Sequence, residues 1–181
     1  PLLAVLKHPL ACLGRTRGAL LVEVRELERK YLRGPRPSGG LAGLRARLDN
    51  DNDGDSEGES EAGPRAVLAD LARAIEPLVK LPDPAALDVR LNALEAACRS
   101  LMARPDAPAD TVLEADPHGA DIAAFFESLR AHAGLCAAIP HQDWPALFDL
   151  WVARPVVRTR RPRESRLFIW GLLEARLMQA D

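Results

Sequence analysis

The sequence predicts an all-α protein, and three observations carry that prediction. Alanine and leucine together supply 59 of the 181 residues, and both residues favour helices. Aromatic residues, which favour strands, make up only 4% of the chain. Apolar residues also recur every three or four positions through most of the chain, which is the spacing of one helix face. We therefore expect a multi-helix domain with one short strand near the C-terminus.

The first helices are marked by apolar stripes and by the residues that interrupt them. One stripe runs from Arg17 to Tyr31 and stops before the helix-breaking run GPRPSGG. A shorter helix is expected over residues 41–48. Another should open at Pro64, where a proline suits the first turn, and should kink or end at Pro77.

Two aspartate–proline pairs predict where the next helices begin. Asp83-Pro84 and Asp116-Pro117 each combine an N-capping side chain with a proline at the first helical position. The apolar stripes behind them end at Leu101 and Cys136, respectively.

The last third of the chain holds one further helix and then a change of character. The helix should include residues 144–151, and an Arg- and Pro-rich stretch follows it. Residues 166–170, RLFIW, predict the single strand, and residues 172–180 predict a final helix.

The net charge of −2 conceals a strong asymmetry. Residues 1–48 carry ten basic and three acidic side chains, and residues 154–166 hold six arginines and one glutamate. A total near zero therefore does not exclude nucleic acid as a partner.

Cysteine usage and hydropathy suggest where the protein works. The three cysteines, at positions 12, 98 and 136, show no CxxC spacing, which favours buried thiols in a reducing compartment. No apolar run is long enough to span a membrane. We expect a cytoplasmic protein.

The acidic stretch DNDNDGDSEGESEAG, residues 49–63, imitates the start of a calcium-binding EF-hand loop. Its twelfth position is Ser60, where such a loop needs a bidentate carboxylate. The alternative is a solvated acidic insertion, because residues 49–61 hold seven carboxylates and no basic or apolar side chain. We favour the insertion and expect no calcium site.

Motifs for catalysis are missing from the sequence. It contains no GxxxxGK[ST] phosphate loop, no HExxH and no GxSxG. His132 and Cys136 stand four residues apart, with His141 nearby, and could hold zinc, but Cys136 also continues an apolar stripe. We expect no catalytic, cofactor-binding or metal-binding residues in the chain.

Two features could bind nucleic acid. The pairs Phe125-Phe126 and Trp144-Trp151 could stack on bases, although their place on apolar stripes favours a role in the core. The stretch ARPVVRTRRPR is the stronger candidate, because its arginines are too dense to pair with nearby acids. A solvated linker remains the alternative. The candidate DNA-binding residues are Arg154, Arg158, Arg160, Arg161, Arg163 and Arg176.

Both ends of the sequence resemble a known family. PLLAVLKHPLACLG, YLRGPRPSGGLAGLRARL and RLFIWGLLEARLMQAD look like the AddB subunit of the bacterial AddAB double-strand-break repair helicase–nuclease, especially its alphaproteobacterial branch. The middle of the chain matches only in being helical and rich in Ala and Leu. Two departures are visible. Glu164-Ser165 stands where the family has His-Pro, and Leu172 stands where it has Pro in Gly-Pro-Leu-Glu.

The resemblance implies a helical insertion, like domain 2B of superfamily 1 helicases, within the second motor domain. Residues 1–157 would form this domain, with residues 49–63 as an acidic loop insertion. Residues 158–165 would be an Arg/Pro-rich linker, and residues 166–181 would start the return to the motor domain. On this interpretation we expect both ends to continue into a longer chain.

The same resemblance implies a DNA-contacting, scaffolding role without chemistry in this fragment. The sequence IWGLLEAR occupies the place of the TxHxxKGLE signature of active motors but lacks its His and Lys. ATP, magnesium and an iron–sulfur cluster would belong to the parent complex outside this chain. The expected partners are DNA and an AddA-type subunit. The rival hypothesis is a protein–protein docking module without DNA contact, which predicts an exposed apolar patch.

Overall fold

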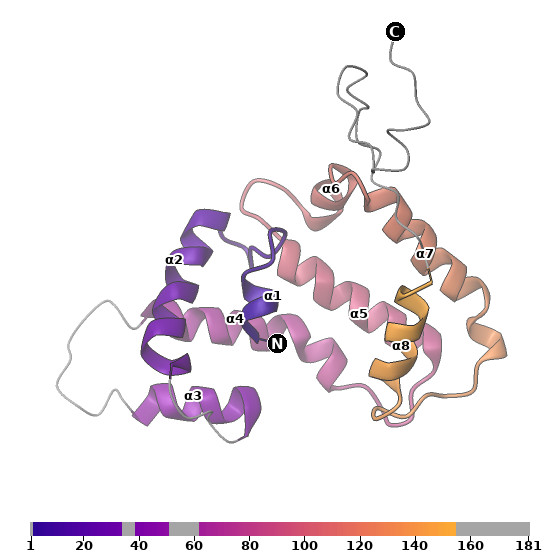
Figure 1. Ribbon diagram of the computed structural model, residues 1–181, viewed down its shortest axis with the longest axis horizontal. Coiled ribbons are helices and arrows are strands. Elements are labelled where there is room, and N and C mark those ends of the chain that lie inside the picture. Colours follow the sequence, from indigo (N-terminus) through magenta and orange to yellow (C-terminus); the bar gives the residue numbers. More distant parts are fainter. Residues whose placement is uncertain (1, 34–38, 51–61, 155–181) are drawn as a thin grey trace, which may run out of the picture.

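The computed structural model describes residues 2–33, 39–50 and 62–154, and this part of the chain is all-α, as the sequence predicts (Figure 1). A π-helical turn, η1 (Glu28–Leu32), continues the second helix, and a 3₁₀ turn, η4 (Ala133–Leu135), follows the seventh. The predicted strand and the final helix lie outside the described residues. The α-helices are α1 (Leu2–Leu6), α2 (Arg17–Leu27), α3 (Gly40–Asn50), α4 (Ala62–Val79), α5 (Leu87–Met102), α6 (Ala109–Glu114), α7 (Gly119–Ala131) and α8 (Trp144–Val152).

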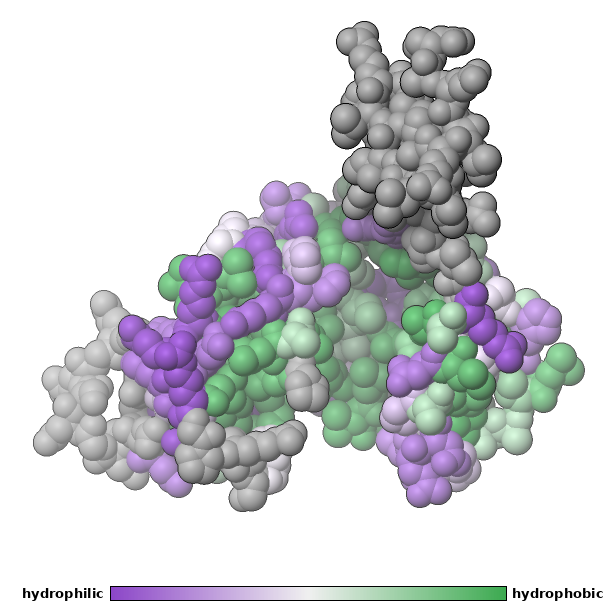
Figure 2. All heavy atoms as spheres, in the orientation of Figure 1, coloured by the Kyte–Doolittle hydropathy of each residue, from purple (hydrophilic) through white to green (hydrophobic). Residues whose placement is uncertain are grey.

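A hairpin of α4 and α5 forms the centre of the molecule (Figure 1). Helices α2 and α3 pack on α4, and α1 packs on α2. Helices α6 and α7 pack on α5, with α8 at the same end of the molecule (Figure 1). Figure 2 shows hydrophilic residues gathered over α2 and a band of hydrophobic residues across the middle of this face, over α5.

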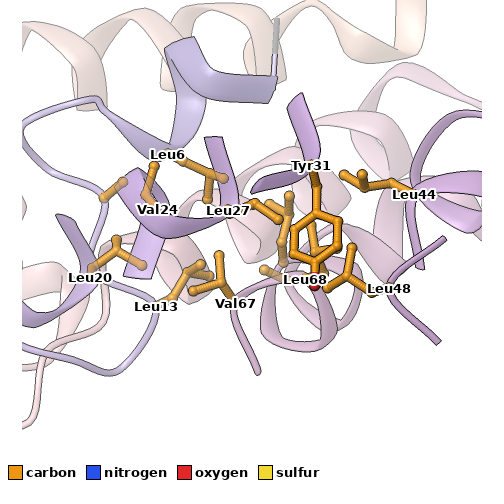
Figure 3. Close-up of a cluster of buried hydrophobic side chains, with 13 residues drawn as sticks. Leu6, Leu13, Leu20, Val24, Leu27, Tyr31, Leu44, Leu48, Val67 and Leu68 are labelled. Carbon is orange, nitrogen blue, oxygen red and sulfur yellow. The ribbon is translucent and has the colours of Figure 1, made fainter. Parts of the chain in front are cut away.

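The larger core cluster joins α1, α2, α3 and α4, and Figure 3 shows its side chains converging from these elements. In α2 and η1 the buried residues recur at spacings of four, three and four, which is one face of a helix. They are Leu20, Val24, Leu27 and Tyr31, and they meet Leu44 and Leu48 of α3 and Val67 and Leu68 of α4.

The smaller core cluster lies between α5 and the α7–α8 end of the chain. Leu87 and Leu91 of α5 and Ile139 of the loop before α8 are buried there. An isolated antiparallel bridge fixes that loop: the Ala85 N–H donates to the Ile139 carbonyl at 3.1 Å, and the Ile139 N–H donates to the Ala85 carbonyl at 2.8 Å. The two clusters are connected through α5, since Leu101 near its end packs against the larger one.

Both aspartate–proline predictions of a helix start are wrong by two or three residues. Helix α5 begins at Leu87 after the N-cap Ala86, and α7 begins at Gly119 after the N-cap His118. The two carboxylates make other contacts. Asp83 Oδ1 accepts a hydrogen bond from the His141 backbone N–H, and Asp116 Oδ1 accepts one from the His118 N–H.

Proline and turn chemistry explain the remaining differences. Helix α4 starts two residues before Pro64 and ends at Val79, two residues beyond Pro77. Helix α7 ends at Ala131, five residues short of the expected stripe, because the chain turns into η4. Asp49, the first residue of the imitated calcium loop, belongs to the last turn of α3, and the segment 51–61 lies outside the described residues.

Among the helices of the described residues, none combines the length and the apolar character needed to cross a membrane.

Candidate functional site

Arg154 is the one candidate DNA-binding residue that lies in the described part of the chain. It follows the end of α8 and is exposed to solvent, and its backbone N–H donates to the Trp151 carbonyl at 3.3 Å. Within the described residues its guanidinium makes no ion pair. The other candidates lie outside those residues, namely Arg158, Arg160, Arg161, Arg163 and Arg176.

The histidines and the cysteine that could have held zinc are spread apart. His132 Nδ1 lies 2.8 Å from the Ser128 carbonyl oxygen, and His141 Nδ1 lies 3.3 Å from Asp83 Oδ1. Cys136 is exposed, so the prediction that all three thiols are buried is wrong for this residue. The cause is the early end of α7, which takes Cys136 off the apolar stripe. The described residues contain no group of three metal-ligating side chains.

Three of the four candidate aromatic residues pack against the smaller core cluster, as their apolar stripes predict. Phe126, Trp144 and Trp151 pack against that cluster. Their rings also contact one another: the Trp144 and Trp151 centroids are 6.2 Å apart, and the Phe125 and Phe126 centroids are 5.8 Å apart, both edge to face.

An apolar groove of about 480 Å³ lies between α1, α5 and α7. The turn after α1 is held to the end of α5 by three backbone hydrogen bonds, in which the N–H groups of residues 12 and 13 donate to the Leu101 carbonyl and that of residue 14 to the Ala103 carbonyl. This connection fixes one wall of the groove. The apolar side chains that line it include Val5, Leu101, Met102, Leu113, Ile122 and Phe126.

Charged residues form a paired network along the same groove. Arg130 Nη2 lies 2.6 Å from Glu95 Oε1, and Arg99 Nε lies 2.9 Å from Asp110 Oδ1. These contacts raise the pKa of both arginines, the hydrogen bond to Asp110 acting most on Arg99 and that to Glu95 most on Arg130. Because these cations are already neutralised, the groove favours an apolar ligand over an anionic one.

A thiol also faces this groove. Cys98 of α5 is half-buried, and its burial raises its pKa above the ordinary value for a cysteine. Burial therefore lowers the reactivity of the Cys98 thiol, and its side chain forms part of the lining of the groove.

A buried arginine fastens the loop before α8 to α5. Arg90 is only 1% exposed. Its Nε donates to the Ile139 carbonyl at 3.1 Å, and its Nη2 donates to the same oxygen. Its guanidinium also lies over the Trp144 ring, 5.6 Å from the ring centroid. Hydrogen bonds from His141 lower the pKa of the nearby Asp83 carboxyl. This cluster is structural, because its polar atoms are directed at the chain itself.

Sequence reasoning missed both the groove and Arg90. The groove is built from residues that lie more than a hundred positions apart in the chain, and its apolar members look like ordinary core residues in the sequence. Arg90 occupies a position on α5 that the charge pattern does not distinguish from exposed arginines. Comparison with family models, with curated proteins and with solved structures finds no significant match to this chain.

Proposed function

We propose that this chain is a helical module of a DNA helicase–nuclease subunit of the AddB type, acting in double-strand-break repair by homologous recombination. In this role it contacts DNA and supports the subunit, and it performs no chemistry of its own. The resemblance of its two ends to AddB supports the proposal, as does the all-α fold of the described residues, which agrees with a 2B-like insertion. ATP, magnesium and the iron–sulfur cluster belong elsewhere in the parent complex, and an AddA-type subunit is its partner.

The single observation that carries the DNA-contacting role is the way the chain leaves α8. Arg154 is exposed at this point, and the Arg-rich stretch of the sequence continues directly from it. That stretch therefore starts at the molecular surface. A guanidinium fork matches the geometry of a phosphate and can bind it through two hydrogen bonds.

The test is a salt titration of binding to single-stranded DNA by the full chain and by a linker variant, Arg158→Ala/Arg160→Ala/Arg161→Ala. Each phosphate contact contributes roughly −0.7 to the slope of log affinity against log salt. The variant should flatten the slope by about two units if all three arginines make contact.

A control variant removes the same charge from three cations that are paired within the protein. Arg73 lies 2.6 Å from Asp70, Lys80 lies 2.6 Å from Glu76, and Arg99 lies 2.9 Å from Asp110. Arg73→Ala/Lys80→Ala/Arg99→Ala should leave the slope close to that of the wild type. A linker variant with the same slope as this control would show that the linker arginines do not contact DNA.

The apolar groove favours a second candidate function, docking of a partner protein without DNA contact. The partner expected from the resemblance is an AddA-type subunit. Ile122 is 38% exposed and lines the groove, whereas Leu150 is 54% exposed on α8 away from it. If docking uses the groove, Ile122→Glu should weaken binding of the purified partner in a calorimetric titration, and Leu150→Glu should not.

A further inference from the structure

Three exposed arginines follow one another along the outer side of α2 and η1. Arg25 lies in the last turn of α2, Arg29 lies in η1, and Arg33 caps the end of η1. They are spaced four residues apart in the sequence, and Arg33 follows at the end of η1, where the backbone becomes extended. We call these residues the arginine row.

The core fixes the direction in which the row points. Leu20, Val24, Leu27 and Tyr31 are at most 4% exposed and hold the opposite side of α2 and η1 against α3 and α4. Because the helix cannot rotate without exposing these side chains, the arginine row is held toward solvent. Hydrophilic residues gather over α2 in Figure 2.

The carboxylates of the same two elements are taken by other cations. Glu23 Oε2 lies 2.9 Å from Arg15 Nε, Glu26 Oε1 lies 3.2 Å from Lys30 Nζ, and Glu28 Oε2 lies 2.5 Å from Lys7 Nζ.

Within the described part of the chain, the members of the row therefore lack such a partner. Arg33 acts on Glu28 only through space, as the smallest of the effects that lower its pKa. Among residues 2–33, 39–50 and 62–154, the three arginines make no ion pair.

Like charges that no carboxylate of the described residues pairs with repel one another at this spacing, so an external anion with repeated charges would relieve the repulsion. We propose that the arginine row binds the phosphate backbone of a nucleic acid without sequence preference. The choice of nucleic acid among polyanions rests on the proposed function. Each guanidinium can hold a phosphate in a fork, and a row of them suits a chain of phosphates. Among the described residues, Val22 is the large apolar residue exposed beside the row, which leaves little to insert into a lipid surface.

The experiment uses the full chain and a row variant, Arg25→Ala/Arg29→Ala/Arg33→Ala, beside the linker and control variants. Binding to a single-stranded DNA of about 20 nucleotides is measured by fluorescence anisotropy between 50 and 200 mM salt. Three lost contacts should flatten the log–log slope by about two units, so the wild type loses about 20-fold more affinity than the row variant over this range. Mixed and homopolymeric sequences should give the same change.

The four proteins separate the possible outcomes. A flattened slope in the row variant with a wild-type slope in the control variant supports the arginine row, whatever the linker variant does. A flattened slope in the linker variant alone overturns the row and leaves the proposed function standing. Equal changes in the row and control variants would mean a net-charge effect and would also overturn the row. Tight binding of the wild type to anionic vesicles, lost in the row variant while DNA binding stays, would overturn nucleic acid as its ligand.

Two further variants guard against a folding defect. Arg25→Gln/Arg29→Gln/Arg33→Gln removes the charges with another residue that favours helices, and it should match the alanine variant. Arg25→Lys/Arg29→Lys/Arg33→Lys keeps the charges, so it should keep the wild-type salt slope while binding more weakly for lack of the fork. A lysine variant with the flattened slope of the alanine variant would overturn the electrostatic account of the row.

Discussion

Arg90 offers a sharp test of how the α8 end is attached to the hairpin. Its replacement by alanine removes hydrogen bonds from a charged donor to the Ile139 carbonyl, worth about 1.5–3 kcal/mol. It also removes the contact with the Trp144 ring, worth about 0.5–2 kcal/mol. Relief of the buried charge offsets part of this loss. We expect Arg90→Ala to lower the free energy of unfolding by about 3 kcal/mol, or to lower Tm by about 6–12 °C.

Arg90→Met gives the matched comparison. Methionine keeps the long apolar stem without the charge, and the Ile139 carbonyl still accepts the Ala85 N–H at 3.1 Å. The carbonyl is therefore not left without a partner, and the loss should be about 1 kcal/mol or less.

The assay is urea unfolding followed by tryptophan fluorescence and by circular dichroism. Arg90→Met as harmful as Arg90→Ala would show that the charge itself is required. An unchanged Arg90→Ala protein would refute the view that Arg90 fastens this loop.

Further expectations concern packing, thiol reactivity and acid stability. A Cβ on Gly119 would lie 1.9 Å from a backbone oxygen of α6, so Gly119→Ala should lower the free energy of unfolding in urea by about 1–3 kcal/mol. Gly18 has open space around it, so Gly18→Ala should not lower the free energy of unfolding. Cys136 should react with a thiol reagent well before Cys98, whose burial and raised pKa protect it. Peptide mass spectrometry gives the order, and equal rates would contradict protection of Cys98 by burial. Hydrogen bonds from the loop before α8 lower the pKa of Asp83. Its contribution to the free energy of unfolding is therefore fully present above the ordinary pKa of 3.8, and it is lost as pH falls through the lower pKa of the folded state. Asp83→Asn should therefore make the free energy of unfolding fall less steeply as the pH is lowered. An unchanged pH dependence would show that this carboxyl does not contribute to stability.

Periodicity predicts the helices that carry long apolar stripes. Leu20, Val24, Leu27 and Tyr31 are all buried as their spacing requires, because a stripe of this kind can be buried only against other helices. Helix starts were less predictable. The Asp83 carboxylate makes its contact with His141, 58 residues away, and no local pattern shows that this contact outweighs N-capping.

The groove and the ion pairs along it also could not be predicted, because they too depend on contacts between distant parts of the chain. Whether an arginine is exposed, paired or buried depends on which side chains the fold brings beside it. Arg90 and Arg25 look alike in the sequence, yet one is buried against Ile139 and the other is exposed on α2. Residues 1–48 carry an excess of positive charge, but the structure is needed to show which of these cations pair with carboxylates.

We propose that the arginine row and the Arg-rich stretch that begins at Arg154 contact DNA. Arginine-specific modification by phenylglyoxal, read out by mass spectrometry with and without single-stranded DNA, tests it most directly. We expect DNA to protect Arg25, Arg29 and Arg158 but not Arg73, whose side chain is 74% exposed and paired with Asp70. Protection that is absent from all of these arginines under conditions of saturated binding would contradict the claim.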